Sequence, residues 1–87
     1  MAWTLEISDL ARKQFRKLDS RLADRITRGM ADIAALENPR LRGKAMAGNL
    51  AGYWRYRFGD YRVIARIEDD RLVIVVLSLG HRREAYR

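Results

Sequence analysis

Hydrophobic and polar residues follow two different periods along this chain, and the change between them separates a helical part from an extended part. At the start, residues 3–7 alternate between apolar and polar side chains, which predicts a short β-strand with Trp3, Leu5 and Ile7 on one face. From residue 53 onward a period of two dominates, whereas the segment between has the longer spacing of helices.

Two helices are expected after the first strand. Ser8 or Asp9 can cap the first helix, and Asp19 or Ser20 can cap the second after the break LDSR. The apolar side of the first helix is predicted to consist of Leu10, Ala11, Phe15 and Leu18. The apolar stripe of the second consists of Leu22, Ile26, Met30 and Ile33, and Asn38-Pro39 ends this helix. The tight link between them predicts an antiparallel helical hairpin.

Three consecutive strands are expected after residue 52. The first, residues 53–58, directs one set of side chains to one face, namely Trp54, Tyr56 and Phe58. Gly59-Asp60 forms a tight turn to a strand over residues 61–67. The run LVIVVLSL is almost continuously apolar, so we expect it to be central and covered on both faces. The tail GHRREAYR then leaves the sheet at its glycine.

The element order is therefore β-α-α-β-β-β, which predicts a single α+β domain over residues 1–87. The N-terminal strand joins a three-stranded antiparallel meander, and the helical hairpin packs on the sheet face that carries Tyr56. Residues 40–52 are rich in glycine and basic residues and are expected to form a loop, either a plain connector or a functional segment. The first residues lack the basic region and long apolar run of a signal peptide or membrane span, so we expect a cytoplasmic protein.

The chain is strongly basic. Lys and Arg number 18 against 11 Asp and Glu, a net charge of +7. Residues 1–38 carry a net charge of +1 and residues 39–87 a net charge of +6. This asymmetry favours a polyanionic partner, most often nucleic acid, over a surface that only confers solubility. Arginine dominates over lysine, and its guanidinium group suits the geometry of phosphate.

Strand alternation places three arginines on the open face of the predicted sheet. Arg55 and Arg57 project from one strand about 7 Å apart. If the turn pairs Phe58 with Tyr61, Arg62 lies directly opposite Arg57. Facing like charges destabilise a sheet, so their convergence favours an anion-binding site, although isolated surface arginines are common.

The loop and the tail add further candidates. Lys44 in the loop is a possible RNA contact, and the tail contains His81, Arg82, Arg83, Tyr86 and Arg87. Tyr86 can stack on an exposed base or anchor the chain end by packing. His81 is the sole histidine, the residue type most often used for proton transfer near neutral pH, although a lone histidine is often structural.

Other chemistries have little support in the sequence. With no cysteine and one histidine, the chain cannot build a thiolate or multi-histidine metal site. It also lacks the carboxylate pair of a glycosidase, a P-loop and a dinucleotide-binding fingerprint. We therefore expect neither a metal nor a cofactor.

The segments WRYRFGDYRVI and GHRREAYR, together with NPR and the glycine-rich loop, resemble the RelE-type toxins of the RelE/ParE toxin–antitoxin superfamily. The resemblance covers nearly the whole chain, including the strand–helix–helix start. It implies a ribosome-dependent mRNA endoribonuclease that cleaves the A-site codon by attack of the 2′-hydroxyl on the adjacent phosphodiester, leaving a cyclic phosphate. The implied site residues are Arg55, Arg57, Arg62, Arg82 and Tyr86.

One feature departs from the family pattern. In the family, the two basic residues of the strand that corresponds to residues 53–58 can be lysines, and one of them is proposed to act as general base. In this chain both positions are arginine, Arg55 and Arg57. Because the pKa of arginine exceeds ~12, we expect these side chains mainly to stabilise the transition state. Proton transfer would then fall to His81, to Tyr86 or to ribosomal RNA.

The resemblance leaves other functions open. One branch of the superfamily keeps the fold and poisons DNA gyrase. A non-catalytic RNA-binding module is a third hypothesis. The presence of the full set of candidate site residues favours the nuclease over the gyrase poison. The resemblance also implies partners: a cognate antitoxin with an acidic amphipathic helix, the ribosome and its mRNA, and operator DNA reached only through the antitoxin.

Overall fold

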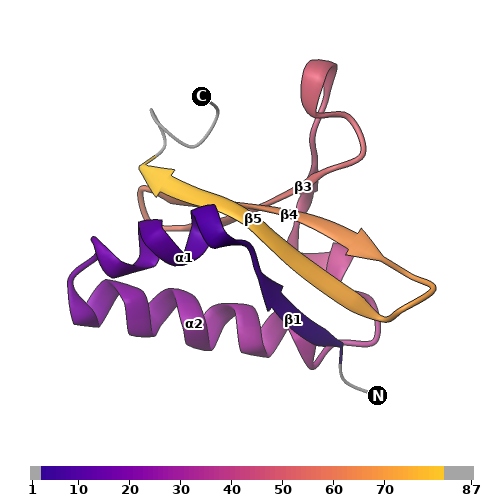
Figure 1. The fold of residues 1–87 in the computed structure, drawn as a ribbon. Helices are drawn as coiled ribbons and strands as arrows, with labels where there is room; N and C mark the ends of the chain where they lie inside the picture. Colours follow the sequence, from indigo (N-terminus) through magenta and orange to yellow (C-terminus); the bar gives the residue numbers. More distant parts are fainter. Residues whose placement is uncertain (1–2, 82–87) are drawn as a thin grey trace.

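The protein folds into one mixed β-sheet with two helices on one of its faces (Figure 1). The computed structural model describes residues 3–81. The helices are α1 Asp9–Arg16 and α2 Ser20–Ala34. The strands are β1 Thr4–Ile7, β2 Lys44–Ala45, β3 Trp54–Phe58, β4 Tyr61–Glu68 and β5 Val73–His81. Two short 3₁₀ helices are η1 Pro39–Arg42 and η2 Gly48–Leu50. The expected α+β architecture is confirmed.

The five strands lie in the order β1-β5-β4-β3-β2. As expected, β5 is central; it is parallel to β1 and antiparallel to β4. Side chains on both of its faces are buried: Ile74 and Val76 belong to the core under the helices, and Val75 on the other face is 8% exposed. Two expectations are wrong. The two-residue strand β2 lies inside the predicted loop, and β5 continues through Gly80 to His81 instead of ending at the glycine.

Side-chain caps start both helices at the predicted positions. Ser8 Oγ accepts a hydrogen bond from the Ala11 amide at 3.0 Å. Asp19 Oδ1 accepts bonds from the amides of Arg21 and Leu22 at 2.9 and 3.0 Å. The stripe of α2 packs into the core, with Ile26, Met30 and Ile33 buried. Neither helix, within the described residues, has the length and apolarity needed to cross a membrane.

One predicted core position of α1 is wrong. Leu10 is 56% exposed, whereas Ala11 is fully buried. Successive residues of an α-helix are about 100° apart around its axis. A short helix that turns Ala11 and Phe15 toward the sheet therefore directs Leu10 to solvent.

A bulge changes which side chains of β5 face the helices. At positions 64–65 of β4 the register with β5 shifts, so that Leu77 has no partner on β4. Ser8 Oγ donates a hydrogen bond to the Leu77 carbonyl oxygen at 2.7 Å, and Gln14 Oε1 accepts one from the Leu79 amide at 2.7 Å. Strand β1 ends before these positions, so the two side chains provide the hydrogen-bond partners that the backbone of β5 would otherwise lack there. After the bulge, odd-numbered residues such as Leu79 face the helices.

Tyr56 anchors β3 in the core. Its side chain is 1% exposed, and its hydroxyl group donates a hydrogen bond to the Pro39 carbonyl oxygen at 2.8 Å. Burial raises the pKa of Tyr56 to about 12, partly opposed by the charge of Arg40. Arg40 donates to both carboxylate oxygens of Asp69 at 3.0 and 2.6 Å and lies 5.7 Å from the centre of the Trp54 ring. These contacts tie η1 to β3 and to the β4–β5 turn.

Helix α2 packs directly against β3 at Gly29. A Cβ atom at this position would lie 2.1 Å from Cε1 of the Phe58 ring, closer than any real contact. Glycine therefore allows the helix and the strand to approach. Because Phe58 follows Arg57 in β3, this contact also positions the strand that carries the predicted site.

We expect Gly29→Ala to destabilise the protein, although alanine in a helix interior is normally more favourable than glycine by roughly 0.5–1 kcal/mol. The added methyl group must displace the Phe58 ring, and such overpacking costs about 1–3 kcal/mol. Urea unfolding measures the change in free energy. In a Phe58→Leu background, where the steric conflict is relieved, the same substitution should be neutral or stabilising. An equal cost in both backgrounds would contradict this explanation.

Candidate nucleic-acid interface

The sheet face away from the helices carries basic side chains on three neighbouring strands. We call the following residues the cationic face: Lys44, Arg55, Arg57 and Arg62. The register pairs Lys44 with Arg55 and Arg57 with Arg62, so two like-charged pairs lie across adjacent strands. The expected position of Arg62 directly opposite Arg57 is confirmed.

The β3–β4 turn fixes this arrangement. Gly59 has a φ of 61°, a left-handed conformation that glycine adopts readily, and two residues suffice to pair Phe58 with Tyr61. Alternation along β3 then sends Tyr56 into the core and Arg57 to the open side. Arg57 Nε donates a hydrogen bond to the Gly59 carbonyl oxygen at 3.3 Å, which holds this exposed side chain near the turn.

Arg62 carries two unsatisfied donors. Its Nε and Nη1 atoms are buried and have no hydrogen-bond partner. A buried donor left unpaired costs about 1–3 kcal/mol, and more when the group is charged. Within residues 3–81, no carboxylate forms an ion pair with Lys44, Arg57 or Arg62. The acidic side chains of the described residues therefore do not offset the positive charge of these three residues.

Elsewhere on this side of the sheet, acidic partners neutralise the basic side chains. Arg66 contacts Glu68 at 2.9 Å, and Arg71 contacts Glu68 at 2.7 Å and Glu6 at 3.2 Å. Hydrogen bonds from Arg71 and then Arg66 lower the pKa of Glu68. Among residues 3–81 on this side of the sheet, the positive charge without an acidic partner therefore lies around Arg57 and Arg62.

His81 lies on the opposite sheet face from these arginines. It pairs with Tyr61, and the two rings meet edge to face with their centres 5.9 Å apart. Tyr61 packs against the core on the helix side. The preceding residue, Gly80, pairs with Arg62, so β5 supplies no side chain at that position. The structure therefore does not bring His81 to the arginines, because the bulge at Leu77 inverts the alternation of β5.

The remaining predicted site residues lie outside the described part of the chain: Arg82, Arg83, Tyr86 and Arg87. Lys44 belongs to β2 rather than to a loop, and its pairing with Arg55 could not be deduced because a two-residue strand has no visible period. Residues 3–81 contain no group of three or more histidine or acidic side chains that could hold a metal ion.

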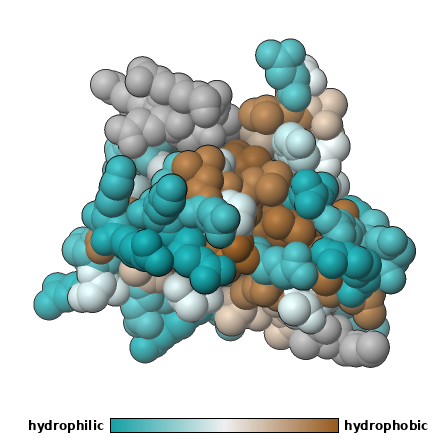
Figure 2. Space-filling model, viewed as in Figure 1, coloured by the Kyte–Doolittle hydropathy of each residue, from teal (hydrophilic) through white to brown (hydrophobic). Residues whose placement is uncertain are grey.

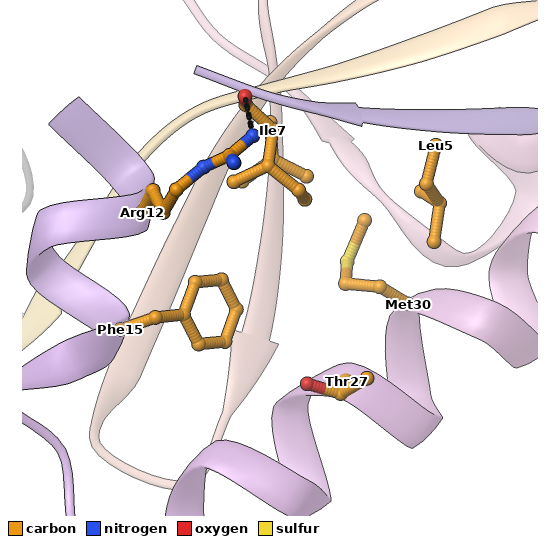
Figure 3. A pocket seen from close by; sticks show the side chains of 7 residues that line it. Leu5, Ile7, Arg12, Phe15, Thr27 and Met30 are labelled. Carbon is orange, nitrogen blue, oxygen red and sulfur yellow. Dashed lines mark hydrogen bonds between the residues drawn. The ribbon is translucent and has the colours of Figure 1, made fainter. Parts of the chain in front are cut away.

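A separate apolar cavity opens on the helix side, between α1, α2 and β1. It has a volume of about 410 Å³ and is lined mainly by Leu5, Ile7, Phe15 and Met30 (Figure 3). Arg12 lies at its edge, where Nη2 donates a hydrogen bond to the Ile7 carbonyl oxygen at 3.4 Å. This lining offers an apolar binding surface rather than groups for catalysis.

Related proteins share this sequence pattern. The family model described as the ParE toxin of the type II toxin–antitoxin system parDE matches residues 5–86. Toxin RelG of Mycobacterium tuberculosis is 33% identical, over 100% of this chain and 99% of its own. The mRNA interferase toxin RelE of Escherichia coli is 28% identical, over 98% of this chain and 88% of its own.

Solved structures share the fold. A chain of the RelBE toxin–antitoxin complex from Mycobacterium tuberculosis matches with a TM-score of 0.86 and 28% identity, over 97% of this chain and 95% of that one. The archaeal RelE–RelB complex from Pyrococcus horikoshii gives a TM-score of 0.74 and 28% identity, over 98% and 100% of the chains. The family match along most of the sequence and these relatives show that the chain belongs to the RelE/ParE superfamily, as a RelE-type toxin of a type II toxin–antitoxin system.

Proposed function

We propose that the protein is a ribosome-dependent mRNA endoribonuclease that cleaves codons in the A site and thereby inhibits translation in the cytoplasm. The observation that carries this proposal is the Arg57–Arg62 pair, two like charges at facing positions that no carboxylate of residues 3–81 offsets. Lys44 and Arg55 extend the same positive surface. The similarity to the Escherichia coli relative, which is named an mRNA interferase, supports the same activity.

The arginines act on the charge that develops during cleavage. The 2′-hydroxyl oxygen attacks the adjacent phosphorus, the bond to the 5′-oxygen breaks, and a 2′,3′-cyclic phosphate remains. The transition state carries more negative charge on its phosphoryl oxygens than the substrate does, so preorganised donors stabilise it selectively. Arg57 and Arg62 project from paired positions on neighbouring strands, which allows both guanidinium groups to bind one phosphate.

Two proton transfers accompany the reaction, one from the 2′-hydroxyl group and one to the departing 5′-oxygen. Arginine stays protonated at physiological pH, so the cationic face supplies neither the base nor a readily lost proton. His81 faces the helix side. We therefore assign proton transfer to Tyr86, which lies outside the described residues, or to groups of ribosomal RNA.

The cognate antitoxin is the second partner in this proposal. Solved RelBE structures show related toxins bound to antitoxins. An acidic amphipathic helix complements the cationic face, and the cavity beside Phe15 and Met30 offers an apolar surface for another part of the same chain. Such a segment folds as it binds, and the antitoxin supplies the contact with operator DNA.

The family model carries the name of the ParE toxins, which makes DNA gyrase the second candidate target. A purified translation reaction analysed by primer extension, together with a DNA cleavage reaction containing gyrase, distinguishes the candidates. Codon-specific cuts in ribosome-bound message support the endoribonuclease, whereas gyrase-dependent double-strand breaks support the alternative. RNA binding without either product supports a non-catalytic module.

Arg57→Ala is expected to slow cleavage of ribosome-bound message by roughly 100- to 1,000-fold, because it removes a donor aimed at the developing charge. Arg57→Lys keeps the charge but loses the guanidinium fork, so it should recover only part of the rate. Single-turnover primer extension measures both rates. The matched control is Arg28→Ala on α2, where the arginine side chain is 78% exposed. If Arg57→Ala and Arg28→Ala slowed cleavage equally, the effect would come from the lower net charge and not from a donor at the reacting phosphate.

His81→Gln is expected to leave the pH dependence of cleavage unchanged between about pH 6 and 8, the range in which histidine titrates. The reason is that His81 contacts Tyr61 on the face opposite the arginines. Cleavage rates of the unaltered chain and the variant are compared across this range, after thermal melts confirm that both are folded. Loss of a titration near neutrality in the variant would instead assign His81 as the general base.

A further inference from the structure

The link between β2 and β3 is an ordered hairpin that projects from the sheet. We call residues 46–53 the hairpin arm. At its base, the Met46 amide donates a hydrogen bond to the Tyr53 carbonyl oxygen at 3.0 Å, and further amide-to-carbonyl bonds close its tip around η2. Figure 1 shows the arm rising on the side of the sheet away from α1 and α2.

The hairpin arm stands clear of the rest of the protein. Residues 47–49 and 51–52 are exposed, and a Cβ atom at Gly48 or Gly52 would meet no atom within 4 Å. A two-residue turn would suffice to join two antiparallel strands. The length of the arm is therefore not required by the fold, and ordering it costs conformational entropy.

The hairpin arm is uncharged in a strongly charged chain. Residues 45–54 contain no acidic or basic side chain, although charged residues make up 33% of the sequence. The arm starts and ends beside the Lys44–Arg55 pair of the cationic face. In Figure 2 the projection is largely brown, tan and white, with hydrophilic colour at its tip.

An RNA strand that follows the cationic face reaches this arm. Arg55 and Arg57 point to the same side of β3, two residues and hence about 7 Å apart. When Arg57 and Arg62 hold the scissile phosphate, the line of positive charge continues past Arg55 and Lys44. A nucleotide next to the scissile phosphate along this line lies at the base of the arm.

We propose that the hairpin arm contacts the base of this neighbouring nucleotide and sets the sequence preference of cleavage; the inference rests on the endoribonuclease function proposed above. Phosphate contacts position a nucleic acid, whereas base contacts specify its sequence. The cationic face supplies the first kind of contact, and the arm is the adjacent surface without charge. Sequence-specific RNA recognition reads the edges of unstacked bases, for which an uncharged surface is suited.

Asn49 is the residue of the arm with the chemistry to read a base. Its side chain is exposed and forms no hydrogen bond within residues 3–81. The amide presents donor and acceptor atoms side by side, which matches the donor and acceptor pattern of adenine. We therefore expect adenine to be the favoured base at the contacted position.

Two variants test this assignment. In the first, residues 47–52 are replaced by Asn-Gly, which keeps the Met46–Tyr53 pair and closes it with a two-residue turn. In the second, Asn49→Ala removes only the amide. The matched control is Leu10→Ala, a neutral change at a position on α1 that is 56% exposed. Cleavage is measured by primer extension on ribosome-bound messages that differ only in the A-site codon.

The control and the unaltered chain should give the same codon profile. Asn49→Ala should reduce the ratio between the fastest and slowest codons by roughly tenfold, mainly by slowing cleavage at codons that contain adenine, and the shortened arm should reduce it at least as much. Thermal melts should nearly coincide for Asn49→Ala, the control and the unaltered chain, because Asn49 is exposed and Gly48 beside it has open space around it.

The other outcomes separate this inference from the proposed function. If the unaltered chain cleaves and neither variant changes the codon profile, the assignment of the arm is overturned while the endoribonuclease stands. An unchanged profile together with lost neutralisation by the antitoxin also overturns it and identifies the arm as a protein contact. Absence of cleavage by the unaltered chain overturns the endoribonuclease and this inference with it.

Discussion

The pairing of Phe58 with Tyr61 across the β3–β4 turn decides which side chains of both strands enter the core. Because side chains alternate, a slip of one residue would move Tyr56 to solvent and bring Arg57 into the apolar layer. The core opposes such a slip, since Tyr56 is buried with its hydroxyl group hydrogen-bonded and Phe58 fits against Gly29. The register that builds the core is thus the register that gathers the arginines, and neither can change without the other.

That register also imposes a cost on the folded state. Lys44 faces Arg55, and Arg57 faces Arg62, although like charges at opposite positions destabilise a sheet. The same side of the molecule shows how the repulsion could be relieved, because Glu68 and Glu6 form ion pairs with Arg66 and Arg71. Around Arg62 the described chain offers no such carboxylate and leaves two donors unsatisfied. Under the proposed function, the phosphate of bound RNA lies between the facing arginines and relieves their repulsion.

Local patterns in the sequence predicted the parts of the structure that depend on neighbouring residues: both helix caps, the apolar stripe of α2 and the Arg57–Arg62 pairing. The parallel pairing of β1 with β5 and the existence of β2 depend on residues far apart in the chain, so no short pattern reveals them. The bulge had the largest effect on the candidate site. The run of β5 is apolar on both faces, which hides the shift at Leu77. Without that shift, alternation would place His81 beside the arginines.

A site built from arginine separates two tasks that lysine can combine. Guanidinium groups remain protonated throughout the physiological range, so their attraction for phosphoryl oxygens does not change with pH. The same property prevents them from accepting the proton of the 2′-hydroxyl group. The strand register directs His81 to the face opposite the arginines. Under the proposed function, the described face supplies charge stabilisation only, and the reaction begins when the chain end or ribosomal RNA provides a proton acceptor. The use of arginine would then explain why cleavage depends on the ribosome. Free RNA bound to this face would be stabilised by the positive charges, but the groups that transfer the protons would be incomplete.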